Sequence, residues 1–150
     1  MDSISESSSR GPAQAPFLLL VDDDEDQLVL FSALLKNADC VVVTASSATA
    51  ALDILRDVHI DLVVTDVNMP GVDGKEFISR VRKASTLSRL PVIAFSAVPE
   101  YAENDLLSCG ADAFCRKTEA RSLSRQVHNI LNDVEKKQSL LEQVQERFSS

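Results

Sequence analysis

Five acidic side chains fill positions 22 to 26, directly after the apolar run FLLLV at residues 17–21. Carboxylates this close in sequence repel one another, so a chain that carries such a cluster usually supplies a cation, a proton or water to relieve the repulsion. The cluster therefore marks a candidate site, and the rest of the sequence must indicate what relieves the charge.

Other side chains with reactive groups also follow apolar runs within one to three positions. They bring a carboxylate, an amide, a hydroxyl and an ammonium group: Asp66, Asn68, Ser96 and Lys117. These residues are far apart in sequence, so they can act together only if the preceding runs end at the same edge of one folded unit.

Short apolar runs alternate with helical patterns along the chain. The runs cover residues 17–21, 40–44, 61–65, 91–95 and 112–115, and the first four are almost continuously apolar, as in strands of a parallel sheet that is covered on both faces. Apolar residues recur at helical spacing in four further segments, and a fifth helix is expected near Thr118: residues 26–37, 47–57, 75–84 and 100–108. The alternation predicts a doubly wound α/β fold with a five-stranded parallel sheet and five helices, the last of them extended. In such folds the site lies at the carboxyl ends of the strands, where the reactive groups would meet.

The converging groups suit phosphoryl transfer to a carboxylate. Asp22, Asp23 and Asp66 carry more negative charge than Lys117 can balance, whereas Mg²⁺ prefers oxygen ligands and is commonly held by carboxylates together with a phosphate. Asp66 would be the nucleophile that becomes an aspartyl phosphate, while Lys117 and Ser96 stabilise the phosphate oxygens. We therefore expect Mg²⁺ as the cofactor of this site.

Five short motifs stand in order at the ends of the expected strands: VDD at 21–23, DVNMPGVDG at 66–74, FSA at 95–97, GADAF at 110–114, and Lys117. Over residues 17–133 these motifs make the chain resemble the response-regulator receiver domains of two-component signalling. The resemblance implies a flavodoxin-like sheet of strand order 2-1-3-4-5. It also implies that a histidine kinase or a phosphotransfer protein phosphorylates Asp66, so the protein would be a signalling switch that assists only its own phosphorylation and dephosphorylation, and not an enzyme.

The resemblance also assigns roles to individual residues. Asp23, Asp66 and the backbone carbonyl of Asn68 would bind Mg²⁺, and Asp22 would act mainly through metal-bound water. Ser96 and Phe114 would form a switch pair that changes the face made by the fourth helix, the fifth strand and the fifth helix. A protein partner, which the sequence does not name, would read that face.

Several positions depart from the commonest pattern of this family. Thr118 follows Lys117 where most receivers have proline, and we expect a trans bond there because a cis bond before a non-proline residue costs about 3 kcal/mol. Phe114 replaces a tyrosine, and residues 96–110 are about one residue short, which predicts a short fourth helix. Val98 cannot orient an attacking water, so we expect slow loss of the phosphoryl group.

Composition narrows the function classes. The 150 residues suit one domain, and the net charge of -8 argues against nucleic-acid binding. No apolar run approaches the roughly 20 residues that span a bilayer, so no membrane contact is expected. Residues 1–16 are rich in Ser, Gly and Pro and predict a disordered leader. The three cysteines are expected to be reduced, which favours the cytoplasm.

The end of the chain continues the helical pattern to Arg147 without proline or glycine. Its side chains follow steps of four and three along one seam: Leu123, Val127, Ile130, Val134, Lys137, Leu141, Val144 and Phe148. Residues 134–150 are therefore expected to form a helical extension. It is either a solvated tail or a surface that binds a second copy or another protein.

Two other functions compete with the phosphorylated switch. A receiver-like module could bind partners without phosphorylation, although the full set of acidic residues, Ser96 and Lys117 argues against it. A small phosphohydrolase of the haloacid-dehalogenase type would use Asp22 and Asp24, but Asp26 stands where that family has threonine or valine.

Overall fold

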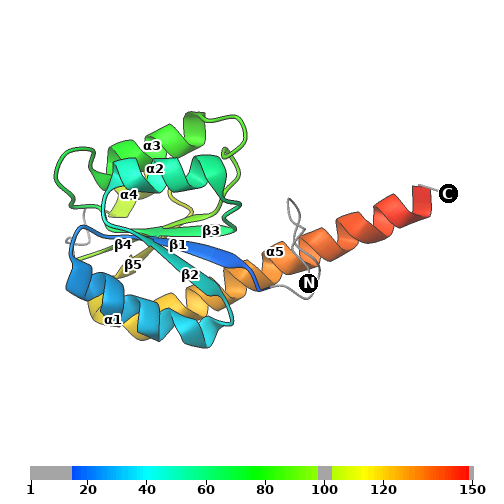
Figure 1. The fold of residues 1–150 in the computed structure, drawn as a ribbon, viewed down its shortest axis with the longest axis horizontal. Coiled ribbons are helices and arrows are strands. Elements are labelled where there is room, and N and C mark those ends of the chain that lie inside the picture. The colour runs from blue at the N-terminus through cyan, green and yellow to red at the C-terminus, as the bar shows by residue number, and fades with distance from the viewer. Residues whose placement is uncertain (1–14, 98–102, 149–150) are drawn as a thin grey trace.

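A computed structural model of the chain describes residues 15–97 and 103–148. These residues form one five-stranded parallel sheet of order β2-β1-β3-β4-β5, as expected (Figure 1). Most of the expected leader, residues 1–14, lies outside the described residues, and so does Val98.

The strands and helices alternate along the chain. The strands are β1 Phe17–Val21, β2 Val41–Ala45, β3 Leu62–Thr65, β4 Val92–Ser96 and β5 Ala113–Arg116. The helices are α1 Glu25–Leu35, α2 Ala48–Asp57, α3 Gly74–Lys83, α4 Glu103–Ser108 and α5 Ala120–Phe148, with 3₁₀ turns at Lys36–Ala38 and Lys117–Glu119.

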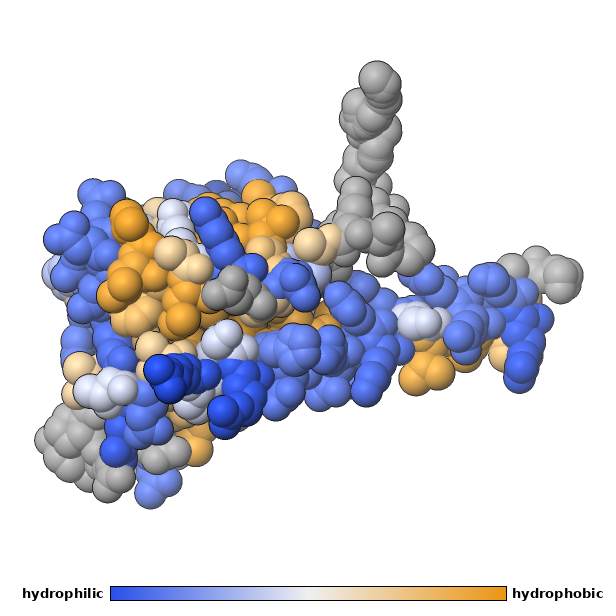
Figure 2. All heavy atoms as spheres, turned by 90° about the horizontal axis from the view of Figure 1, so that it is seen from below, coloured by the Kyte–Doolittle hydropathy of each residue, from blue (hydrophilic) through white to orange (hydrophobic). Residues whose placement is uncertain are grey.

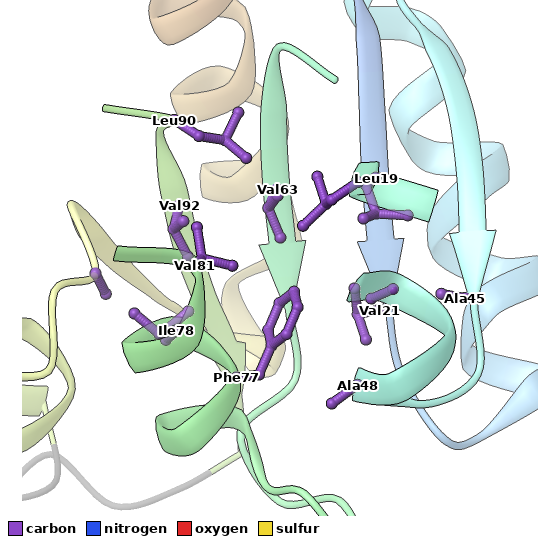
Figure 3. Packing of buried hydrophobic residues seen from close by; sticks show 14 of the residues in the cluster. Leu19, Val21, Ala45, Ala48, Val63, Phe77, Ile78, Val81, Leu90 and Val92 are labelled. Carbon is purple, nitrogen blue, oxygen red and sulfur yellow. The ribbon is translucent and has the colours of Figure 1, made fainter. Parts of the chain in front are cut away.

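Helices cover both faces of the sheet, with α1 and α5 on one face and α2, α3 and α4 on the other (Figure 1). Alternate side chains of β1 point to opposite faces of the sheet and belong to two separate hydrophobic layers. Leu19 and Val21 pack with residues of α2 and α3, whereas Leu18 and Leu20 pack with residues of α1 and α5. Phe77 of α3 points into the first of these layers and is fully buried (Figure 3). Burial on both faces explains why the strands appear in the sequence as unbroken apolar runs.

Several expected boundaries were wrong by one or more residues. β2 begins at Val41 and not at position 40, because the Val41 amide is the first to pair, with the carbonyl of Pro16 at 2.9 Å. Asp112 directly precedes β5. Its carboxylate accepts a hydrogen bond from the amide of Val92 at 2.8 Å, and its own amide donates to the carbonyl of Val92 at 2.8 Å. The fifth helix begins at Ala120, after a 3₁₀ turn that contains Thr118.

The loop after β3 returns tightly to the sheet through two glycines. Gly71 has a φ of 77°, a conformation that other residues rarely adopt. A Cβ at Gly74 would lie 2.5 Å from the carbonyl oxygen of Asp66 and 2.5 Å from the Cα of Val67. The start of α3 can therefore pack directly on the end of β3 only because position 74 has no side chain.

The helix α5 runs past the sheet and projects beyond the amino-terminal ends of the strands (Figure 1). Leu123, Val127 and Leu131 are buried against the sheet, whereas the residues after position 134 are exposed. Hence the expected extension of the last helix is confirmed through Phe148. None of the helices in the described part of the chain is both long and apolar enough to cross a membrane.

Candidate functional site

Three carboxylates meet at the carboxyl ends of β1 and β3. Oxygen atoms of Asp22, Asp23 and Asp66 all lie within 4.8 Å of one another. Parallel pairing produces this arrangement, because Val21 is in register with Thr65 and the acidic residues follow both. The convergence of Asp22 and Asp23 with Asp66 was predicted from the apolar runs.

Asp66 is enclosed and held by the backbone that follows it. Its side chain accepts hydrogen bonds from the amides of Val67, at 2.7 Å, and Asn68, at 3.4 Å. Burial raises the pKa of the Asp66 carboxyl, and the charge of Asp22 raises it further, while Lys117 and the two amides oppose the rise. The site therefore disfavours the negative charge of ionised Asp66, and a bound cation would relieve that unfavourable charge.

Lys117 reaches the same site from the end of β5. Its ammonium group lies 2.8 Å from Oδ2 of Asp22 and 3.5 Å from Oδ2 of Asp66. The same group donates a hydrogen bond to the side-chain oxygen of Gln27 in α1. The ring centroid of Phe95 lies 6.0 Å away, so the ammonium also approaches an aromatic face.

The remaining predicted residues lie around this centre at different depths. Ser96 is buried and is the last residue of β4, not the residue after it, while Phe114 is half-buried in the neighbouring strand. The register pairs Ala94 with Phe114 and Ser96 with Arg116, so the two switch residues are diagonal neighbours across two strands. Their switching stays a prediction. The side chain of Asn68 is exposed, and a role for its carbonyl as a metal ligand also stays a prediction.

The donor set at this site fits a hard divalent cation. Two of the three carboxylates are buried, Asp23 is exposed, and Lys117 is the cation that contacts Asp22 and Asp66. Three carboxylates with one ammonium leave a net negative charge, and all the nearby ligand atoms are oxygens, as Mg²⁺ requires. These residues could therefore hold Mg²⁺.

The structure bears on two of the three predictions that we drew from the departures from the commonest receiver pattern. The bond between Lys117 and Thr118 is trans, because the described residues contain no cis peptide bond. The described part of α4 is short, at six residues. The slow loss of a phosphoryl group, which we base on Val98, concerns a position outside the described residues and stays a prediction.

Sequence reasoning missed two residues that organise the site. Asp24 accepts hydrogen bonds from the amides of Asp26 and Gln27 and so caps α1, which turns part of the acidic run into a helix start. Gln27 contacts Lys117. Its position one turn into a helix that leaves the acidic cluster was a signal, since a side chain there points back over the helix start.

Comparisons with known proteins agree with this geometry. A family model described as the response regulator receiver domain matches residues 18–129. The two-component response regulator ARR15 of Arabidopsis thaliana is 34% identical over 104 residues, which are 61% of this chain and 50% of ARR15. The sensor protein GacS of Pseudomonas syringae pv. syringae is 33% identical over 109 residues, which are 70% of this chain and 12% of GacS.

A solved structure is similar over nearly its whole length. The crystal structure of a putative response regulator from Chloroflexus aurantiacus J-10-fl has a TM-score of 0.73 and 30% identity, and the match covers 79% of this chain and 99% of that one. The chain thus spans half or less of the two sequence relatives above, and the part that they share is the receiver domain. With its sheet order, its three clustered carboxylates and a family match over most of its length, this chain belongs to the response regulator receiver domain family of two-component signalling.

Proposed function

We propose that this protein is a phosphoacceptor switch in a two-component phosphorelay and that Asp66 accepts the phosphoryl group. The observation that carries the proposal is the placement of a buried Asp66 carboxylate within 4.8 Å of two other carboxylates and 3.5 Å from the ammonium of Lys117. The protein would promote only its own phosphorylation and dephosphorylation, so its role is that of a signalling protein and not of an enzyme.

The donor would be a phosphohistidine of a histidine kinase or of a phosphotransfer protein. A carboxylate oxygen of Asp66 attacks phosphorus, the new P–O bond forms as the P–N bond breaks, and the leaving imidazole takes up a proton. The amides of Val67 and Asn68 hold the other end of the carboxylate, which fixes the direction of attack.

Charge neutralisation completes this chemistry. Mg²⁺ held by Asp22, Asp23, Asp66 and the carbonyl of Asn68 would supply positive charge to the transferring phosphoryl group. Lys117 is within reach of the same oxygens because it already contacts Asp66, and Ser96 can donate its hydroxyl proton from the end of β4. The five side chains come from the ends of four strands, β1, β3, β4 and β5, and therefore keep their relative positions.

The helix α1 offers a surface for the phosphodonor. Val29 and Leu30 lie in its middle with 72% and 61% of their surfaces exposed. The acidic cluster stands at the start of the same helix, so a protein that covers these apolar side chains would bring its histidine close to Asp66.

The output would pass through Ser96 and Phe114. A phosphoryl group on Asp66 would draw the hydroxyl of Ser96 toward it, and the half-buried ring of Phe114 would follow into the space released. We expect this shift to change the face formed by α4, β5 and α5, where a partner protein would distinguish the two states.

The chain divides by function in this proposal. Residues 1–16 are a leader, residues 17–133 are the receiver domain, and residues 134–150 are an extension that binds a second copy of the protein. The described cysteines are free, and we place the protein in the cytoplasm, where a histidine kinase would phosphorylate it.

Intact-mass measurement after incubation with Mg²⁺ and acetyl phosphate tests the proposal. We expect a gain of one phosphoryl group in the wild type, none in Asp66→Asn, and none when a chelator removes the metal. A folded wild-type protein that gains no phosphoryl group in the presence of Mg²⁺ would contradict the proposal and favour a module that works without phosphorylation.

A further inference from the structure

The projecting part of α5 carries large apolar side chains that the rest of the described chain leaves uncovered. Leu140, Leu141, Val144 and Phe148 are exposed by 61%, 61%, 51% and 79%. Hydrophobic residues gather along one edge of the projecting helix, and the rest of its visible surface is hydrophilic (Figure 2). A helix with such a stripe is stable when another surface covers it.

The stripe continues the face that binds the sheet. Val134, Leu141 and Phe148 follow at intervals of seven residues, and Lys137 and Val144 form the second line of the same seam. This is the spacing by which one helix packs against another along its length. The natural occupant of such a seam is therefore a helix.

A pocket lies at the foot of the projection, where α5 leaves the sheet. Its volume is about 460 Å³, and its apolar lining includes Val58, Leu87, Leu90, Pro91 and Val134. Arg56 and Arg89 also line it, from the end of α2 and from the segment before β4. The pocket is large enough for an aromatic ring, and Asp57 and Asp61 line it together with the two arginines.

We propose that a second copy of this chain covers the stripe, with the two projecting helices packed antiparallel and Phe148 of the partner subunit seated against this pocket. The inference rests on the proposed role of the extension as a pairing surface, and it supplies the alignment and the contact residues.

Charge complementarity selects the antiparallel alignment. Asp133, Leu140 and Arg147 flank the seam at intervals of seven residues. When two such helices run in opposite directions about Leu140, Asp133 of each copy faces Arg147 of the partner subunit. Neither residue forms an ion pair within the described part of the chain. A parallel alignment would instead place the Lys137 side chains of the two copies against each other in the seam, which costs free energy.

The same alignment explains the pocket. It brings Phe148 of the partner subunit to the level of Ile130 and Val134, and Val134 lines the pocket. Both ends of each helix are covered in this arrangement, and the contact is the same on the two copies, as a two-fold dimer requires.

The test is sedimentation equilibrium of the full unphosphorylated chain in metal-free buffer. We expect the wild type to dimerise and Phe148→Ala to weaken the dimer about 10- to 100-fold, because an aromatic anchor in a pocket carries much of the binding energy. Val58→Glu, which changes the pocket lining, should weaken the dimer, whereas Val29→Glu on the exposed face of α1 is the matched control and should not.

Charge reversal tests the direction of the helices. Asp133→Arg alone or Arg147→Asp alone should weaken the dimer about 3- to 10-fold, and the two changes in one chain should restore it, because each then faces an opposite charge. A double variant as weak as the single variants would overturn the antiparallel alignment.

A wild type that stays monomeric up to about 200 µM would overturn the dimer itself and leave the leader or a different protein to cover the stripe. Phosphorylation of Asp66, read by mass on the same samples, is independent of these results, so failure of the dimer and failure of the switch are distinguishable.

Discussion

The ammonium group of Lys117 lies 2.8 Å from a carboxylate oxygen of Asp22, and only 14% and 4% of the two side chains are exposed. Because water is nearly excluded, the attraction between these two charges is screened less than in a surface pair, and it directs the lysine over the acidic site. The lysine enters the site from β5 and the aspartate from β1, strands that are separated in the sheet by β3 and β4. The pair therefore ties the two sides of the site together above the strand that carries Asp66.

Gln27 is predicted to position this lysine. The Gln27→Leu variant removes the oxygen that accepts a hydrogen bond from Lys117, so the ammonium loses one of its contacts and its orientation toward Asp66. We expect the rate of phosphorylation by acetyl phosphate to fall about 3- to 10-fold, as for the loss of one neutral hydrogen bond. Time-resolved intact-mass measurement gives this rate. The Gln27→Glu variant keeps an acceptor oxygen and should retain most of the rate, and equal losses in both variants would contradict a positioning role.

Asp66 is predicted to cost stability in the metal-free protein. Burial raises the pKa of its carboxyl, so the folded state favours the protonated form. The stability that protonated Asp66 contributes is fully present below the pKa that this carboxyl has in the unfolded chain. It is lost as the pH rises through the higher pKa that the same carboxyl has in the folded protein. At pH 7 in a chelating buffer, Asp66→Asn should therefore raise the midpoint of thermal unfolding, by roughly 2 to 4 °C. The gain should shrink as the pH falls toward 3, and a gain that grows at low pH would contradict this account. The control is Asp23→Asn, at an exposed carboxyl, for which we expect a smaller change in the midpoint of thermal unfolding.

Magnesium is predicted to stabilise the folded chain through the clustered carboxylates. A ligand present at 100 times its dissociation constant adds about 2.7 kcal/mol to the free energy of unfolding when it binds only the folded state. Thermal unfolding with increasing Mg²⁺ should show a rising midpoint in the wild type and a weaker rise in Asp23→Asn. Asp26→Asn is the matched control, since that exposed acid lies in the same run but outside the cluster. An equal response in Asp23→Asn and the wild type would contradict a site at these carboxylates.

Gly74 is predicted to be essential for the loop that follows Asp66. An alanine Cβ would lie 2.5 Å from two backbone atoms of residues 66 and 67, and backbone cannot move aside as a flexible side chain can. Gly74→Ala should reduce the free energy of unfolding by about 2 kcal/mol or more. In Gly71→Ala the new methyl group meets no atom within 4 Å. The loss of unfolding free energy then comes only from the positive φ at this position, and we expect about 1 kcal/mol. Urea unfolding compares the two variants, and a smaller loss for Gly74→Ala would contradict the close contact.

The fold was largely predictable because the three central strands, β1, β3 and β4, are buried on both faces and the helices pack on the sheet through one face. Continuous apolar runs such as FLLLV and helical spacing in residues 75–84 report those environments directly. Strand ends were less predictable. Cys40 and Asp112 look like strand residues, but the strands begin one residue later, at Val41 and Ala113, and strand ends depend on pairing with the neighbouring strand and not on residue type.

The carboxylates and the lysine of the site were predictable for the same reason as the fold, since the ends of parallel strands meet at one edge of the sheet. The position of Gln27 at the start of the helix after the acidic run was a signal that it lies near the site, but its contact with Lys117 was not predictable, because that contact depends on how far two long side chains reach. The pocket at the foot of α5 was also beyond sequence reasoning. Its lining combines segments around residues 58, 90 and 134, which only the packing of α5 against the sheet brings together.

The measurement that tests the central claim most directly is the location of the phosphoryl group. After incubation with Mg²⁺ and acetyl phosphate, borohydride reduces an acyl phosphate to an alcohol, and tryptic digestion then separates residues 57–75, which include Asp66, from residues 11–36, which include Asp22 and Asp23. We predict that reduction occurs at Asp66 within residues 57–75 and is absent in Asp66→Asn. Reduction at Asp22 or Asp23, or modification that persists in Asp66→Asn, would contradict the assignment of Asp66 as the phosphoacceptor.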